Sequence, residues 1–265
     1  MFRRIASELR RHVLFTTLGI ISGIIILALI FFSNIPRQIF LLASLALLAD
    51  VGSGLFSLLP RFRGISTRYV IAFSAGIVIS VALFELLPKA NSEDNWALLG
   101  AGFFIMYLID KGLALHQCGE SECEVTGMSW VAILGMSADN LLDGVALAVT
   151  YLTEPRLGIV VTLAIIAHEI PQFITSTLIM KEQGYRLTRI IVILLVAGLV
   201  FPLGAGLGQF IPTAAHQAAI AFVAGVFIYT GATALMTEAH HRFNWLVMLF
   251  LLLGSLIALG LKFVE

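Results

Sequence analysis

The chain has 265 residues, of which 59% are hydrophobic and 12% charged, and its acidic and basic residues balance. Soluble domains carry about 25% charged residues, so this composition and a mean hydropathy of +1.00 argue against a soluble fold and predict a polytopic membrane protein. No basic surplus points to nucleic acid, and two cysteines are too few for a disulfide framework.

Nine apolar runs follow one another along the chain, and each has about the 20 residues that a transmembrane helix needs. The sequence therefore predicts an all-α membrane helix bundle of about nine transmembrane helices. The runs cover residues 12–33, 37–60, 69–89, 96–117, 127–151, 157–181, 187–211, 214–238 and 244–264.

The first run is either a retained helix or a cleaved signal segment. Its apolar core is longer than the roughly 7–15 residues of a signal peptide, and the sequence SNIPR that follows offers no small-x-small cleavage site. We therefore expect residues 1–35 to form an extra N-terminal transmembrane helix and residues 36–265 to form the main body.

Lysine and arginine are unevenly divided between the two ends of the predicted helices. With a cytoplasmic N-terminus, 12 of the 16 basic residues fall on the cytoplasmic side and 4 on the outside. Because cytoplasmic loops are enriched in basic residues, we expect a cytoplasmic N-terminus and an external C-terminus. The expected location is the plasma (inner) membrane.

Two of the runs resemble each other. FSAGIVISVALFELLPKA, from Phe73, aligns with FVAGVFIYTGATALMTEA, from Phe222, and the predicted topology orients the two copies in opposite directions. Inverted repeats that flank a central pair of helices are typical of secondary transporters, whose binding site lies near the middle of the membrane.

The first helix of the central pair carries polar residues in its middle, in the sequence SADNLLDG. Asp139 and Asp143 are four residues apart and therefore share one helical face, with Asn140 beside them. The second helix contains AHEIPQF, in which His168 and Gln172 are four residues apart and Glu169 follows His168. Each helix thus predicts a polar face in an apolar span.

A carboxylate in the middle of a bilayer costs about 2.5–3.5 kcal/mol on insertion scales, so this group needs compensation. Neither helix has a basic residue in its interior, and the simplest missing counter-charge is a metal ion. Carboxylate, amide and imidazole ligands without thiolate suit zinc, iron(II), manganese, cobalt or cadmium. The alternative is a set of protonated carboxyl groups that form hydrogen bonds within the bundle.

The sequence HEIPQ also invites comparison with the H-E-x-x-H motif of zinc metalloproteases. Gln172 stands in place of the second histidine, and Pro171 is expected to break or loosen the helix. Both features argue against an intramembrane protease. The same proline frees the carbonyl group of Ala167 at the predicted site.

From these motifs the chain resembles the ZIP (Zrt/Irt-like) family of divalent-metal transporters over nearly everything after the first helix. DNLLDG, residues 139–144, is similar to the family's H-N-x-x-[DE]-G motif, and HEIPQ to H-E-I-P-[HE]. FELLPKA places Glu85 where the family has a histidine, and FPLG places Phe201 where many members have an acid. The resemblance implies an eight-helix core and metal movement toward the cytoplasm.

The resemblance also implies a primary and an auxiliary metal site. The first would use Asp139, Asp143, His168 and Gln172, and the second Asn140, Asp143, Glu169 and Gln172. Because the acid at position 201 is missing, we expect one good site and a weakened or absent second. Asp139 in place of the family's histidine hardens the ligand set and gives weight to iron or manganese.

Further polar residues are candidates for the ion pathway, each with a structural alternative. Glu85 is an entrance ligand or an interfacial residue, and Asp50 lines or modulates the pathway or forms hydrogen bonds within the bundle. His240 and His241, beside Glu238, form an exit site or an interfacial anchor. The loop with His116, Cys118 and Cys123 receives the metal or is simply a solvated acidic loop.

The predicted function is transport of zinc or a similar divalent transition metal into the cytoplasm, with the metal as substrate and no organic cofactor. Expected partners are divalent metal ions and the lipid bilayer, with no nucleic acid, and the resemblance implies a homodimer. The alternatives are a membrane-embedded metal-dependent hydrolase, which lacks a third basic ligand, and a metal sensor, which lacks an output domain.

Overall fold

A computed structural model describes residues 36–59, 67–115, 130–239 and 244–262, and within these ranges the chain is helical and contains no strand. The last eight predicted runs each correspond to a helix, which confirms the all-α fold class. The elements are α2 (Arg37–Ser57), α3 (Thr67–Val81) continued by η2 (Ala82–Leu86) and α4 (Leu87–Lys89), α5 (Ser92–Leu115), α6 (Trp130–Thr153), α7 (Pro155–Glu182), α8 (Leu187–Gly208), η3 (Thr213–Ala215), α9 (His216–Ala239) and α10 (Trp245–Lys262).

Six helical segments in the described part of the chain are both long and apolar enough to cross a membrane. They are Arg37–Ser57, Arg68–Lys89, Ile133–Thr153, Pro155–Glu182, Leu187–Gly208 and Thr213–Thr233, and Trp245–Gly260 is a shorter apolar helix. The predicted first helix, residues 12–33, lies outside the described residues, so the total of nine stays a prediction.

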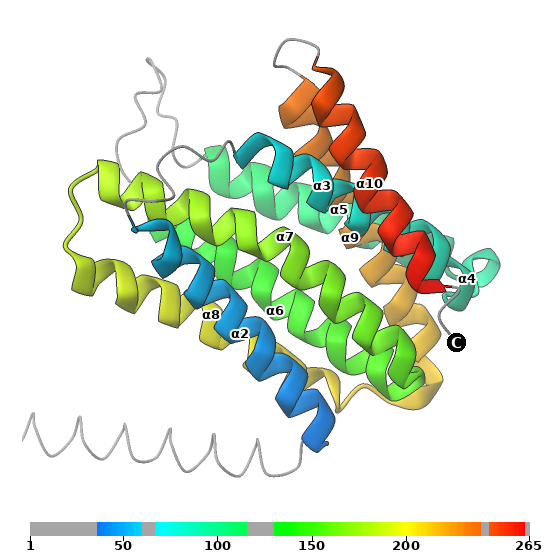
Figure 1. Ribbon diagram of the computed structural model, residues 1–265. Helices are drawn as coiled ribbons and strands as arrows, with labels where there is room; N and C mark the ends of the chain where they lie inside the picture. Colours follow the sequence, from blue (N-terminus) through cyan, green and yellow to red (C-terminus); the bar gives the residue numbers. More distant parts are fainter. Residues whose placement is uncertain (1–35, 60–66, 116–129, 240–243, 263–265) are drawn as a thin grey trace, which may run out of the picture.

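The helices form two groups of four (Figure 1). One group contains α2, α6, α7 and α8, in which α6 packs on α8 and α2 packs on α7. The other contains α3, α5, α9 and α10, in which α3 packs on α10 and α5 packs on α9. Contacts of α3 with α7 and of α6 with α9 join the groups.

The two copies of the predicted repeat pack in equivalent ways. Gly76 of α3 lies against the backbone of α10, where an added Cβ would be 2.1 Å from the carbonyl oxygen of Leu251. The aligned Gly225 of α9 lies against the backbone of α5, where a Cβ would be 2.0 Å from the carbonyl oxygen of Leu99. The aligned glycines therefore have the same role: each brings its own helix into backbone contact with a neighbour, α10 for α3 and α5 for α9. This equivalence supports the repeat inferred from the sequence.

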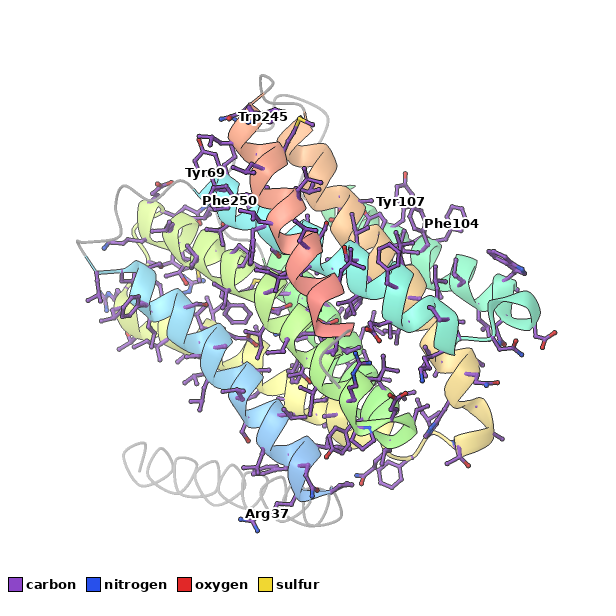
Figure 2. The ribbon with its side chains drawn as sticks, turned by 45° about the vertical axis from the view of Figure 1, so that its right-hand side comes forward. Arg37, Tyr69, Phe104, Tyr107, Trp245 and Phe250 are labelled. Carbon is purple, nitrogen blue, oxygen red and sulfur yellow. The ribbon has the colours of Figure 1, made fainter. Side chains whose placement is uncertain are left out.

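Apolar side chains also cover the outside of the bundle. Figure 2 shows Phe104, Tyr107 and Trp245 at the surface, and Phe104 and Trp245 are 62% and 66% exposed. A lipid environment accepts such a surface, whereas water would not. The polar residues of the central helices are instead buried among the helices.

Proline affects two helices differently. Pro171 does not break α7, which stays helical from Pro155 to Glu182, so the predicted break is wrong. Neighbouring helices support the backbone around such a proline in a membrane bundle. In contrast, α3 widens into one π-helical turn before Pro88, where the N–H of Leu87 donates to the carbonyl oxygen of Ala82.

The glycine contacts predict a sharp difference between substitutions. We expect Gly76→Ala or Gly225→Ala to lower the free energy of unfolding by about 1–3 kcal/mol, because a methyl group would force two backbones apart. Gly100→Ala is the matched control, since a Cβ there meets nothing within 4 Å and alanine favours the helix. Thermal unfolding of the detergent-purified chain measures the effect, and equal midpoints for all three variants would contradict it.

Candidate metal site

Two neighbouring helices, α6 and α7, bring the predicted ligands together. Asp139, Asn140 and Asp143 are one turn of α6 and are 6%, 0% and 1% exposed. His168 and Glu169 of α7 are also buried, and Gln172 lies beside Asp139, close enough for their side chains to interact. We call Asp139, Asp143, His168 and Glu169 the donor cluster.

The distances within the donor cluster suit a shared cation. The His168 Nε2 atom lies 3.0 Å from Asp143 Oδ2 and 3.5 Å from Glu169 Oε1. One donor atom each from Asp139, His168 and Glu169 lie within 4.8 Å of one another. A metal ion that lies about 2 Å from each of two donor atoms holds these atoms up to about 4 Å apart, so small shifts of the side chains would allow the cluster to bind one ion.

Backbone carbonyl groups orient two of the polar side chains. The Nδ1 atom of His168 lies 3.1 Å from the carbonyl oxygen of Ala164, which can only accept a hydrogen bond. Nδ1 therefore carries a proton, and Nε2 is the ring nitrogen that faces the carboxylates and would bind a metal. Asn140 Nδ2 likewise donates to the carbonyl oxygen of Ala197 at 2.9 Å. This bond leaves Asn140 Oδ1 available as a ligand.

Several atoms that face the site have no hydrogen-bond partner in the described part of the chain. They are Asp139 Oδ1, Asn140 Oδ1 and both carboxylate oxygens of Glu169, whereas Asp143 Oδ2 and His168 Nε2 face each other at 3.0 Å. α6 contains no lysine or arginine, and α7 has none between Arg156 and Lys181. Buried polar atoms are normally satisfied, so this concentration of free acceptors indicates a cation site.

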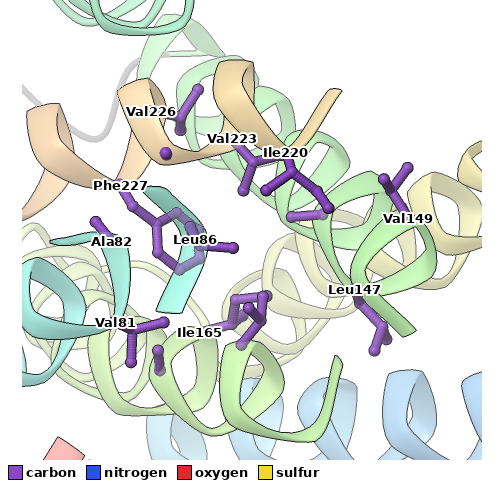
Figure 3. Packing of buried hydrophobic residues seen from close by; sticks show 14 of the residues in the cluster. Val81, Ala82, Leu86, Leu147, Val149, Ile165, Ile220, Val223, Val226 and Phe227 are labelled. Carbon is purple, nitrogen blue, oxygen red and sulfur yellow. The ribbon is translucent and has the colours of Figure 1, made fainter. Parts of the chain in front are cut away.

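An apolar layer lies beside the donor cluster. Phe227 of α9 packs edge-on against the His168 ring, with 6.0 Å between ring centroids. Around it lie Val81, Leu86, Ile165 and Val223, as Figure 3 shows. A cavity of about 20 Å³ between α6 and α9 reaches Asp143, which is room for about one water molecule.

The structure separates Glu85 from the donor cluster. Its carboxylate lies 3.4 Å from Arg156 Nη1 at the start of α7, about three helical turns before His168. Lys89 and Glu154 form a second ion pair at the same end of the bundle. Any role of Glu85 at the entrance stays a prediction.

The sequence did not predict which residues surround Asp50 of α2. Asp50 is completely buried, and neither carboxylate oxygen has a hydrogen-bond partner among the described residues. The alternative of hydrogen bonds within the bundle therefore gains no support there, and a role in the ion pathway stays a prediction. The charge of Asp50 interacts with those of His168, Asp143 and Glu169. The only sequence signal was an aspartate in the middle of an apolar run.

Several predicted residues lie where the structure gives no account of their side chains. They are Glu238, whose side chain is not described, and His240, His241, His116, Cys118 and Cys123, which lie outside the described residues. Phe201, at the position where an acid was noted as missing, is completely buried in α8 and offers no ligand.

Comparisons with known proteins point to one family. A family model described as ZIP zinc transporter matches residues 113–262, more than half of the chain. The chain is 24% identical over 135 residues to zinc transporter ZIP13 of Pongo abelii, a match that covers 44% of this chain and 40% of that protein. It is 20% identical over 210 residues to zinc transporter YKE4 of Saccharomyces cerevisiae, covering 65% and 61%.

A third relative is the uncharacterized protein MJ1036 of Methanocaldococcus jannaschii, 27% identical over 122 residues, which are 43% of this chain and 52% of that protein. The chain thus spans between two fifths and about three fifths of the length of these relatives. The similarity therefore identifies the family, and the transported ion belongs to the proposal below.

The unpartnered oxygens predict opposite effects of one substitution with and without metal. We expect Asp139→Asn to leave the metal-free protein as stable or more stable, because one like charge is removed, and to weaken metal binding by about tenfold or more. A ligand at one hundred times its Kd stabilises a protein by about 2.7 kcal/mol, and a tenfold loss of affinity removes about half of that.

Thermal unfolding with and without Zn²⁺ or Mn²⁺ measures both effects. Ser137→Ala is the matched control on α6, because the hydroxyl group of Ser137 only donates to the carbonyl oxygen of Ile133. An Asp139→Asn protein that metal stabilises as strongly as wild type would rule out Asp139 as a ligand.

Proposed function

This chain belongs to the ZIP zinc transporter family, and from that premise we propose that it carries a divalent metal ion across the membrane through the donor cluster of α6 and α7. Several relatives are named as zinc transporters, among them ZIP13 and YKE4. In this reading the metal is the substrate that passes through the site.

One observation carries the proposal: three carboxylates and one imidazole converge in the core, with no lysine or arginine beside them in the described residues. Left empty, such a site is held together against electrostatic repulsion and desolvation. A divalent cation removes both costs at once. Since every member of the cluster must be deprotonated to bind, proton release accompanies loading, and we expect uptake to slow at acidic pH.

The donor set favours borderline to hard transition metals. His168 supplies one nitrogen, and Asp139, Asp143 and Glu169 supply oxygen. Zinc accepts this combination, and so do iron(II), manganese, cobalt and cadmium. With three carboxylates to one imidazole, we expect manganese and iron(II) to compete well with zinc.

The direction of transport is proposed from the distribution of basic residues. With the N-terminus in the cytoplasm, the Glu85–Arg156 pair faces outside, and metal moves from there toward the cytoplasm. The apolar layer around Phe227 then closes the outer side of the site. Alternating access requires the repeat-related helices to move relative to the donor cluster.

The plasma (inner) membrane location, the external C-terminus and the homodimer are also part of the proposal. The mass of the purified protein in detergent tests the dimer. The hydrolase and sensor alternatives gain no support from a particular side chain in the described residues.

The first test is metal uptake into proteoliposomes. We expect saturable uptake of at least one of Zn²⁺, Mn²⁺, Fe²⁺ and Cd²⁺ by wild type, and a fall of at least about tenfold for Asp143→Ala, because Asp143 lies 3.0 Å from His168 Nε2. Asp94→Asn removes an exposed carboxylate and is the control for lost charge. Uptake that stays normal in Asp143→Ala would contradict the proposed pathway.

A second test concerns the ion pair at the proposed entrance. We expect Glu85→Gln to raise the KM for metal uptake several-fold with little change in kcat, because a carboxylate that meets the ion before the donor cluster affects capture more than translocation. Asp94→Asn again serves as the control. A fall in kcat at constant KM would mean that Glu85 acts in the movement itself.

A further inference from the structure

A polar contact that involves a methionine sulfur bridges α6 and α7, apart from the donor cluster. The hydroxyl group of Ser176 on α7 donates to the Sδ atom of Met136 on α6, with 3.3 Å between oxygen and sulfur. Met136 is 6% exposed. A polarisable sulfur atom therefore lies in the core between the two helices that carry the donor cluster.

The register of the two antiparallel helices places this contact next in line after the donor cluster. The Asp143–His168 contact of 3.0 Å belongs to the cluster. The Met136–Ser176 contact lies seven residues away along α6 and eight along α7, toward the end that faces the cytoplasm in the proposed orientation. At 1.5 Å per residue, the two contacts are about 10–12 Å apart along the bundle. An ion that leaves the cluster between α6 and α7 therefore meets Met136.

Met136 also shares a helical face with a member of the donor cluster. It is three residues from Asp139, and residues three apart are neighbours on the surface of a helix. On α7, Ser176 follows Gln172 by four residues and so continues the face on which Gln172 lies. The row of polar side chains between the two helices thus extends past the carboxylates to the sulfur.

The direction of the Ser176 hydroxyl group distinguishes this contact from ordinary helix packing. Serine and threonine inside a helix commonly donate to a carbonyl oxygen of the preceding turn. Ser137 of α6 and Thr162 of α7 do so here. The hydroxyl group of Ser176 turns across to the other helix instead. The sulfur of Met136 is therefore open to a polar partner from the side of α7.

A second buried methionine shows the arrangement expected for packing alone. Met180 of α7 is completely buried and belongs to the same apolar cluster as Met136, together with Phe173 and Leu194. Its sulfur has no polar partner among the described residues. Met180 is therefore a matched control for the packing role of Met136.

We propose that the sulfur atom of Met136 contacts the metal ion as it leaves the donor cluster, and that it selects softer cations at this step. The three carboxylates of the cluster suit hard ions such as Mn²⁺, whereas a thioether suits Zn²⁺ and the still softer Cd²⁺. The thioether carries no charge, so it holds an ion weakly and lets it move on. This inference deepens the proposed function and rests on it for the direction of movement.

The first experiment compares sulfur with volume at position 136. Uptake of Cd²⁺ and Mn²⁺ into proteoliposomes is measured for Met136→Leu and Met136→Cys, in a parent chain whose Cys118 and Cys123 are replaced by serine. Leucine preserves the volume of methionine, whereas cysteine preserves the sulfur and leaves a gap. We expect the kcat for Cd²⁺ to fall at least about fivefold in Met136→Leu, with less than about a twofold change for Mn²⁺. Met136→Cys is expected to keep the preference for Cd²⁺.

Met180→Leu in the same parent chain is expected to leave the ratio of the two kcat values unchanged. A packing role of Met136 predicts the reverse order, in which Met136→Leu behaves like the parent chain and Met136→Cys impairs uptake of both metals alike. That order, or an equal loss for both metals in Met136→Leu, would overturn the inference.

A binding measurement separates this inference from the proposed function. In detergent with excess Cd²⁺, we expect Met136→Cys to develop the ultraviolet charge-transfer absorption of a cadmium–thiolate bond, and Met180→Cys to develop none. If the parent chain transports neither metal but the absorption appears, the proposed function is wrong and the contact at position 136 stands. If transport is normal and the absorption is absent although Cd²⁺ binds, the contact is wrong.

Discussion

The need to neutralise carboxylates in an apolar interior governs this structure. Four of them, Asp50, Asp139, Asp143 and Glu169, are buried without a lysine or arginine partner in the described residues, and His168 is the one basic group recorded beside them. A protein domain has only about 5–15 kcal/mol of net stability, and several uncompensated charges would consume much of it. Without a cation these carboxylates would be costly to bury, and the divalent ion of the proposed function would lower that cost while it is bound.

Close helix packing supplies the stabilisation that offsets the burial of these carboxylates. Gly144 and Gly204 bring α6 and α8 into backbone contact, with added Cβ atoms only 2.1 Å and 2.2 Å from carbonyl oxygens of the opposite helix. This contact places Ala197 where it accepts the hydrogen bond of Asn140. Without a hydrophobic force between helices in lipid, such dispersion contacts and hydrogen bonds supply the rigidity that the ligands require.

Most of the helix pattern was readable in the sequence, because length and apolarity are sufficient to define a membrane span. The donors on α6 and α7 were readable as well, since residues four apart share a helical face. The position of Asp50 could not be predicted, because it depends on which helices pack together. The contacts of Gly54 with α7 and of Gly198 with α2 became visible only in the structure. The carbonyl partners of His168 and Asn140 were equally hidden, since every residue has a carbonyl group.

The glycine contacts have a mechanical consequence. Within each group of four helices, backbones touch directly, as they do at Gly76 and Gly144, so these pairs cannot shift without breaking atomic contacts. Between α6 and α9 the contact consists of aliphatic and aromatic side chains around a small cavity. Side chains of this kind can exchange neighbours at little cost. The boundary between the groups is thus the plane along which we expect the molecule to slip, with all four buried carboxylates travelling together on one side of it.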